Sequence, residues 1–185
     1  MSTIDVPQPS LSRLTPFANR PAVVAMTPSR HHLVIATAIA WAQACGSELY
    51  FAYADRSRQV ISENPDGSVE HRDAVIDIAP DESWRGRQAD CEMFLHEQVD
   101  PSGVPWQFRY LAGRPDRALT HLARAVQASC IIVGTRTQRS GRAKRLRDYL
   151  EHSLPEQLAH HQHRPVLAVP LSVVDWATPL APLGE

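Results

Sequence analysis

The last third of the sequence places the strictest limits on the fold. Residues 128–136 read Ala-Ser-Cys-Ile-Ile-Val-Gly-Thr-Arg, so a short run rich in β-branched residues ends in a glycine. Residues 153–156 read Ser-Leu-Pro-Glu, the spacing of a helix capping box, and residues 166–169 form a second apolar run. This order predicts a strand, a crossover helix and a parallel strand. A loop at the carboxyl end of the first strand is then placed to bind an anion.

The first half of the chain predicts the same alternation. Residues 21–26 are typical of a buried strand, and residues 27–29 of a turn in which Ser29 is the helix N-cap. Residues 48–54 predict the second strand, and Gly46 is placed to end the intervening helix in the left-handed conformation. The apolar residues at helical spacing, which we expect to face the core, are Leu33, Ala36, Ile39, Ala40 and Ala44.

The middle of the chain is less regular. Residues 58–78 hold two polar–apolar runs around Asn-Pro-Asp-Gly at 64–67, which indicates either a β-hairpin insertion or an irregular excursion. Residues 81–99 predict a helix, 104–112 a strand, and Gly113-Arg114-Pro115-Asp116 the start of a helix that continues to Val126. The large side chains that we expect the first of these helices to turn inward are Trp84, Met93, Phe94 and Val99.

Composition limits the class of protein. With 185 residues, 43% of them hydrophobic, and a formal net charge of −1, the chain is neither disordered nor a general polyanion binder. We expect one domain over 21–171 with an insertion around 56–80, a flexible arm over 1–20 and a second arm over 172–185. The three cysteines have no C-x-x-C spacing, which favours core thiols in a reducing compartment over a disulfide framework. The first residues do not show a basic stretch followed by an apolar one, and no apolar run reaches roughly 18 residues, so we expect a cytoplasmic protein without a membrane partner.

The order and spacing of these pieces resemble the universal stress protein family. The residues that support the resemblance are the strands at the two ends, Gly113-Arg114-Pro115 before a helix, the 128–136 run and the 164–169 run. It covers roughly residues 21–171. It implies an α/β fold of the adenine nucleotide alpha hydrolase type: a single five-stranded parallel sheet, order 3-2-1-4-5, with helices on both faces. It also implies a homodimer paired through the last strand, which here is Val166, Leu167, Ala168 and Val169.

The resemblance also says what a nucleotide site of this family would need. In ATP-binding members the first strand ends in an aspartate near the adenosine, and the loop after the fourth strand has three glycines, the last followed by Ser or Thr. This chain keeps Gly134, but it has Thr27 in place of the aspartate, Thr137 in place of the second glycine and His152 in place of the third. Backbone N–H groups approach phosphate oxygens closely only where no side chain obstructs them. We therefore expect binding of ATP or AMP to be weak or absent, and no required cofactor.

Should a nucleotide bind, the sequence still indicates where. We expect Thr27 and Tyr53 at the base end and Gly134, Arg136, Gly141 and Ser153 at the phosphates. Residues 136–147 contain only basic charges, a pattern that fits a phosphate-binding loop and fits a solvated loop balanced by Asp148 and Glu151 about equally well. Leu146, Tyr149 and Leu150 at helical spacing favour a helix in the second half of this segment.

Other chemistry finds less support. His160, His161 and His163 lie close together, but no carboxylate or cysteine has matching spacing, so we give a metal site odds of roughly one in ten. No Gly-x-Ser-x-Gly motif is present, and Cys130 lies within a predicted buried strand, so no catalytic residue is assigned. The tryptophans are more typical of core or interface positions than of stacking platforms for nucleic acid.

These observations favour a non-catalytic, cytoplasmic stress-response protein with a degenerate nucleotide-binding loop. The alternative is an ATP-binding member of the same family that hydrolyses ATP slowly and uses the basic segment 136–147 for phosphate contacts. An electron-transfer or adenylate-forming relative on the same sheet is a third class, but no flavin or synthetase signature is present.

Overall fold

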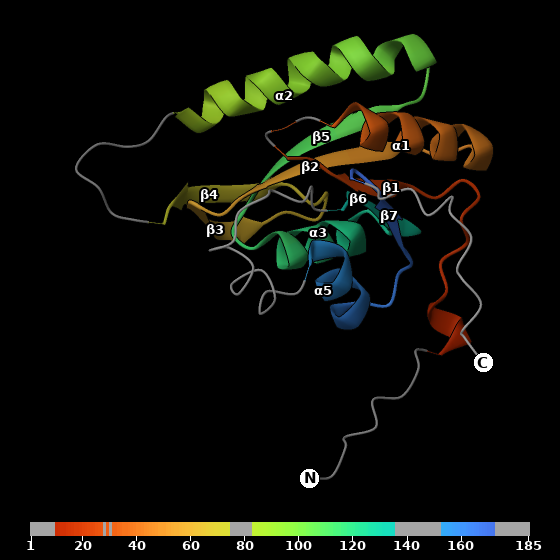
Figure 1. The fold of residues 1–185 in the computed structure, drawn as a ribbon. Helices are drawn as coiled ribbons and strands as arrows, with labels where there is room; N and C mark the ends of the chain where they lie inside the picture. Colours follow the sequence, from red (N-terminus) through yellow and green to blue (C-terminus); the bar gives the residue numbers. More distant parts are fainter. Residues whose placement is uncertain (1–9, 28, 30, 75–82, 136–152, 173–185) are drawn as a thin grey trace, which may run out of the picture.

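The fold is known from a computed structural model of the chain (Figure 1), which describes residues 10–27, 29, 31–74, 83–135 and 153–172. Its centre is a parallel sheet of five strands: β1 (Ala22–Ala25), β2 (Leu49–Asp55), β5 (Trp106–Ala112), β6 (Cys130–Gly134) and β7 (Val166–Val169). Their order is β5-β2-β1-β6-β7, which is 3-2-1-4-5 when only these strands are counted. The predicted fold class and strand order are therefore confirmed.

Helices cover both faces of this sheet (Figure 1). Helices α1 (His32–Cys45) and α2 (Ser83–Val99) lie on one face, and α3 (Pro115–Ala125) and α5 (Leu154–His161) on the other. The chain also forms two short 3-10 helices, η1 (Leu11–Arg13) and η2 (Asp100–Ser102). Neighbouring residues of one strand face opposite layers: Val24 packs with the α1 and α2 residues and Val23 with the α3 and α5 residues. The strands are apolar on both faces for this reason.

Helix α1 begins later, and buries a different face, than the sequence predicts. Its N-cap is His31, which makes no side-chain capping bond, so Ser29 is not the N-cap. The buried residues of α1 are Val34, Ile35, Ala38 and Ala42. Leu33 is 53% exposed, and Ala36, Ala40 and Ala44 of the expected stripe are exposed as well. Of that stripe, Ile39 is half-buried and packs against the core as predicted. Nearly every residue of this helix is apolar, so two adjacent stripes fit the 3.6-residue period and only the contact with the sheet chooses between them. Gly46 ends the helix in the left-handed conformation, as predicted, with φ of 62°.

Helix α2 and strand β5 differ from their predictions in detail. Phe94 and Val99 of α2 are buried and Trp84 is half-buried, but Met93 is 57% exposed, and Cys91 and Leu95 take the inner positions instead. Strand β5 begins at Trp106, two residues later than expected, because Pro105 has no N–H to donate; its carbonyl accepts from the N–H of Leu49.

The segment after β2 is a β-hairpin, so the hairpin alternative is confirmed over the irregular one. Strands β3 (Arg58–Glu63) and β4 (Val69–Asp73) pair antiparallel around the predicted turn. Gly67 occupies that turn with φ of 80° and lies against Leu122 of α3. The hairpin therefore packs beside α3 at the β5 edge of the sheet, where Val69 joins the core of that layer.

The ends of the described chain contact this framework. Phe17 meets Trp41 edge-on, and the N–H of Asn19 donates to the carbonyl of Cys45. Ser153 is the N-cap of α5 but makes no side-chain capping bond, so the reciprocal capping box that its sequence predicts does not form on that side. The search for a membrane-spanning segment covers the described residues, and no helix among them has the length and apolar character to cross a bilayer.

Candidate ligand-binding site

A pocket of about 340 Å³ opens at the carboxyl ends of β1 and β2. The first residues of α3 and α5, Pro115 and Leu154, close its other side. Its volume lies in the range of pockets that hold small organic ligands. The residues that line it are Ala25, Met26, Thr27, Ala52, Tyr53, Ala54, Asp55, Arg56, Ser57, Pro115, Leu119 and Leu154.

The parallel pairing of β1 and β2 explains why these residues meet. Ala25 pairs with Ala52, and the N–H of Met26 extends the ladder by donating to the carbonyl of Ala52. Strand β2 is three residues longer than β1 beyond this pair, so Tyr53 and Asp55 project past the end of β1 beside Thr27. Parallel strands present their carboxyl ends at one edge of a sheet, which is where ligands bind in open α/β folds.

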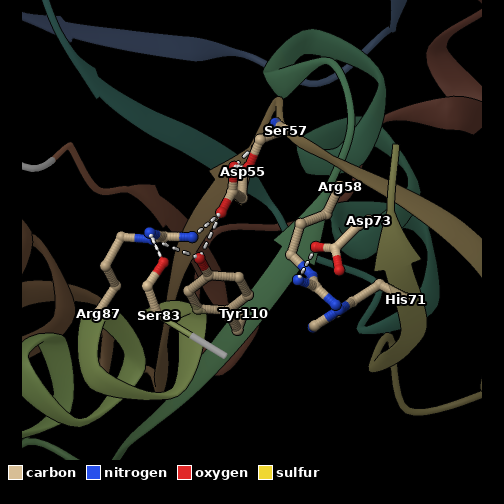
Figure 2. Close-up of polar contacts among 8 residues, drawn as sticks. All are labelled: Asp55, Ser57, Arg58, His71, Asp73, Ser83, Arg87 and Tyr110. Carbon is tan, nitrogen blue, oxygen red and sulfur yellow. Dashed lines mark hydrogen bonds and ion pairs between the residues drawn. The ribbon is translucent and has the colours of Figure 1, made fainter. Parts of the chain in front are cut away.

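Asp55 is the centre of the polar wall of the pocket (Figure 2). One carboxylate oxygen accepts from the backbone N–H of Ser57 at 2.9 Å and from its hydroxyl at 2.6 Å. The other accepts from the hydroxyl of Tyr110 at 2.6 Å and from Arg87 of α2 at 2.9 Å. Arg87 also donates to the Tyr110 hydroxyl at 3.1 Å and to Ser83 at 2.6 Å. Asp55 thus joins β2, β5 and the start of α2 at the rim of the pocket.

These bonds keep Asp55 ionised. Burial alone raises the pKa of its carboxyl group, but the hydrogen bonds from Ser57, Tyr110 and Arg87 outweigh burial and lower the pKa to about 2. Burial and the nearby Asp55 charge raise the pKa of Tyr53, and burial together with the bond to Asp55 raises that of Tyr110. Both phenols are therefore neutral at pH 7. Because the Asp55 oxygens already accept four bonds, the role of this carboxylate is to hold the rim in place.

The hairpin is attached to the same wall through a buried arginine (Figure 2). Arg58, 5% exposed, donates from Nε to Nδ1 of His71 at 2.6 Å and from Nη1 to Asp73 at 2.6 Å. The ring of His71 meets that of Trp84 edge-on, with centroids 4.6 Å apart, and Trp84 lies beside Tyr110. Burial and the Arg58 charge lower the pKa of His71, which keeps the ring neutral and able to accept. The hairpin, α2 and the pocket rim thus form one continuous set of contacts.

Gly134, which the sequence predicts at the phosphates, is covered by another part of the chain, unlike Thr27 and Tyr53, which line the pocket. A Cβ added to Gly134 would lie 2.6 Å from Cδ1 of Leu171 and 3.1 Å from Cγ2 of Val34. The hydroxyl of Thr135 accepts from the N–H of Leu171 at 3.0 Å, which fixes the chain after β7 over this glycine. Gly134 therefore allows close packing of Leu171, and it does not line the pocket.

The structure brings together part of the predicted site. Thr27 and Tyr53 both line the pocket, and Ser153 precedes the lining residue Leu154. Gly134 lies on the neighbouring strand under Leu171. Arg136 and Gly141, with the whole basic segment 136–147, lie outside the described residues, so the loop prediction stays a prediction.

Sequence reasoning missed the residues that shape the rim. Asp55 directly follows the predicted second strand, a position at the carboxyl edge of the sheet where a polar residue is a recognisable signal. Arg87 and Tyr110 gave no such signal, because their bonds to Asp55 span 32 and 55 residues of sequence. Only the packing of α2 and β5 against β2 brings them together.

Metal binding finds no support in the described part of the chain, where no three His, Cys, Asp or Glu residues lie close enough to hold an ion. His160 and His161 are exposed at the end of α5, and His163 is half-buried. Cys91 and Cys130 are buried and Cys45 is half-buried, all as free thiols, and burial raises the pKa of Cys130 to about 12. None of these groups lines the pocket.

Comparison with known proteins agrees with this architecture. The model of the universal stress protein family matches residues 19–170. No protein with a curated description matches the sequence. Among solved structures, the universal stress protein UspA from Lactobacillus plantarum gives a TM-score of 0.58 at 12% identity, covering 82% of this chain and 98% of that chain.

Two further similar structures contain nucleotides. A universal stress protein in complex with cAMP gives a TM-score of 0.52 at 22% identity, covering 83% of this chain and 98% of that one. The universal stress protein from Archaeoglobus fulgidus in complex with dAMP gives 0.51 at 16% identity, covering 80% and 96%. At sequence identities of 12–22%, these similarities show the fold and nothing about ligands of this chain. Because the family model spans the whole sheet and its helices, the chain belongs to the universal stress protein family.

Proposed function

We propose that this chain is a non-catalytic, cytoplasmic stress-response protein whose pocket takes adenine nucleotides only weakly. The observation that supports this most directly is the contrast between the two sides of the site. A nucleoside-sized pocket is present between Thr27, Tyr53 and Leu154, whereas Gly134 is packed under Leu171. The similar structures with cAMP and dAMP make an adenine nucleotide the natural first ligand to test.

The expected affinity follows from the contacts that this sequence lacks. Thr27 replaces the expected aspartate at the end of the first strand, and Thr137 and His152 replace two of the expected loop glycines. Losing one hydrogen bond to a charged phosphate costs on the order of 1–3 kcal/mol, and each 1.4 kcal/mol is about a tenfold change in affinity. Two such losses move a micromolar binder towards millimolar. We expect the arginines of the segment 136–147 to recover only part of this loss, because salt screens the attraction between a guanidinium group and a phosphate in water.

Titration of the full-length protein with ATP, ADP and AMP at physiological salt tests the proposal. We expect dissociation constants on the order of 0.1–1 mM, within the weak-binding range argued above. Calorimetry would detect binding in the low-micromolar range, and NMR chemical shifts would follow saturation in the millimolar range. Replacing Thr27 with tryptophan fills the mouth of the pocket and should abolish the shifts; Ala159→Trp, at an exposed position of α5, is the control. A low-micromolar constant for any of the three nucleotides contradicts the proposal.

The same samples separate binding from hydrolysis. Slow ATP hydrolysis is the alternative function, with residues 136–147 holding the phosphates. Release of inorganic phosphate from ATP that Thr27→Trp abolishes and Ala159→Trp leaves unchanged would favour this alternative over a non-catalytic role.

We also propose a homodimer formed through β7. This strand pairs with β6 on one side, and no other described strand pairs with it. Leu167 in its centre is 38% exposed, and an unpaired edge with an apolar residue favours pairing with a second copy. The opposite edge of the sheet, β5, has the hairpin packed beside it.

Light scattering at micromolar concentration checks the dimer. We expect the wild-type protein to have twice the monomer mass, and Leu167→Glu to have the monomer mass, because the charge would lie in the apolar interface. Ile61→Glu places the same charge at another exposed apolar position, on β3, and should leave the dimer intact. A monomeric wild-type protein contradicts the proposal.

A further inference from the structure

A cluster of positive charge lies at the end of the molecule opposite the pocket. Arg124 is in the last turn of α3, His163 and Arg164 connect α5 to β7, and Arg13 is in η1. We refer to these four residues as the basic cluster. The Nε of Arg164 lies 2.7 Å from the carbonyl oxygen of Ala128, just past the end of α3 that carries Arg124. The charges of Arg164, Arg13 and Arg124 all lower the pKa of His163, which agrees with the four side chains lying in one region.

The connection between α5 and β7 is held in a fixed shape. The side-chain amide of Gln162 donates to the carbonyl of Arg164 at 2.6 Å, and its oxygen accepts from the N–H of Arg164 at 2.6 Å. The Nε of Arg164 donates to the carbonyl of Ala128 at 2.7 Å. With backbone and Nε both held, the two terminal amino groups of this guanidinium have a set direction before any ligand arrives. This is the kind of preorganisation that lowers the entropic cost of binding.

Within the described part of the chain, little negative charge offsets the basic cluster. No acidic side chain of the described residues pairs with any member of the basic cluster, and none contributes to the surroundings of His163. The carbonyl end of α3 carries about half a negative charge, which stabilises Arg124 but cannot balance the other two guanidinium groups. Burial and the surrounding arginines lower the pKa of His163, so the ring is neutral at pH 7 and has an N–H to donate.

We propose that the basic cluster is a binding site for a multivalent phosphate anion, formed by Arg13, Arg124, His163 and Arg164. Arginine suits this role because its planar group donates two parallel hydrogen bonds to phosphate oxygens. Three arginines with one imidazole match several phosphate oxygens at once and exceed the charge of a single monovalent anion. This site is independent of the proposed nucleotide pocket: Arg124 lies near the C-terminus of α3, and nine residues at 1.5 Å each place it about 14 Å along the helix from Pro115.

Calorimetric titration of the full-length protein with inorganic tripolyphosphate tests this site. We expect saturable binding at physiological salt that weakens as salt is raised, because screening reduces attraction between charges. The double variant Arg13→Gln and Arg124→Gln removes two exposed charges whose side chains hydrogen-bond to none of the described residues, so the fold is retained, and should weaken binding at least tenfold. Arg117→Gln is the matched control, since it removes an exposed charge from the pocket end of the same helix and should change affinity less than twofold.

The pKa of His163 gives a second, independent readout. A bound anion favours the protonated ring, so tripolyphosphate should move its NMR titration upward in the wild-type protein and not in the double variant. Absence of saturable binding overturns the proposal, as does equal loss of affinity in Arg117→Gln or displacement by AMP, which would place the anion at the pocket. Binding of single-stranded DNA but not of tripolyphosphate, lost in the same double variant, would overturn it in favour of a nucleic-acid surface.

Discussion

Replacing Asp55 with asparagine is expected to lower the free energy of unfolding at pH 7 by about 2–4 kcal/mol. The carboxylate is 6% exposed and accepts from Ser57, Tyr110 and Arg87. An amide keeps one acceptor but turns its N–H₂ towards two donors, so charge-assisted bonds are lost and a donor is left facing donors. The loss stays below that of a fully buried pair because the Arg87 side chain is 37% exposed and regains water.

The same substitution should remove part of the acid sensitivity of the protein. The pKa of Asp55 is about 2 in the folded chain and 3.8 as its ordinary value, so the folded state favours the ionised form. That stability, about 2 kcal/mol, is fully present above pH 4 and is lost as pH falls through 3.8 towards 2. Urea unfolding at a series of pH values should therefore show a flatter profile for Asp55→Asn in this window than for the wild-type protein.

The control for the loss of one negative charge is Glu97→Gln. Glu97 is exposed on α2, and its replacement removes the same charge from the chain without touching the rim. We expect its unfolding free energy to stay within about 0.5 kcal/mol of wild type. If Asp55→Asn were equally mild, or kept the full acid sensitivity between pH 4 and 2, Asp55 would not be the residue that holds the rim.

Local patterns predicted the sheet because each strand is a short apolar run that pairs with another of the same kind. Strand β6 (Cys130–Gly134) lies within the 128–136 run, and β7 has the bounds of the apolar run 166–169. In α1 the pattern was ambiguous, since Leu33 and Val34 are equally apolar and only the sheet beneath decides which is buried. Ser29 failed as an N-cap for a related reason: a capping residue is defined by where the helix begins, which packing sets.

The site was harder to predict than the fold, because its geometry depends on contacts distant in sequence. Thr27 and Tyr53 could be placed with the strand order that the family resemblance implies, as both lie at carboxyl ends of adjacent strands. The packing of Leu171 over Gly134 could not be predicted from the sequence, since it depends on the path of the chain after β7. A glycine that lets a backbone N–H approach a phosphate and a glycine that makes room for a leucine cannot be told apart from the sequence alone.

Gly67→Ala is expected to destabilise the protein by about 2–4 kcal/mol, chiefly by displacing the hairpin from α3. Gly67 has φ of 80°, where an L side chain costs roughly 1–2 kcal/mol. The added Cβ would also lie 2.4 Å from Cδ1 of Leu122, which is 1% exposed and packed on all sides. Leu122 cannot turn away without disturbing the core, so the hairpin has to move. Hydrogen exchange should accelerate at the amides of β3 and β4 more than in the central sheet.

Gly103→Ala separates the two causes of this effect. Gly103 has φ of 68°, close to that of Gly67, but no heavy atom lies within 4 Å of the Cβ that alanine would add. Its substitution therefore reports backbone strain alone, about 1–2 kcal/mol, and leaves the exchange of β3 and β4 unchanged. The excess loss in Gly67→Ala measures the contact between the hairpin and Leu122. Equal losses of stability in the two variants would contradict this prediction. They would mean that the hairpin shifts away from Leu122 at no cost, and that the contacts among Arg58, His71 and Trp84 hold it without help from α3.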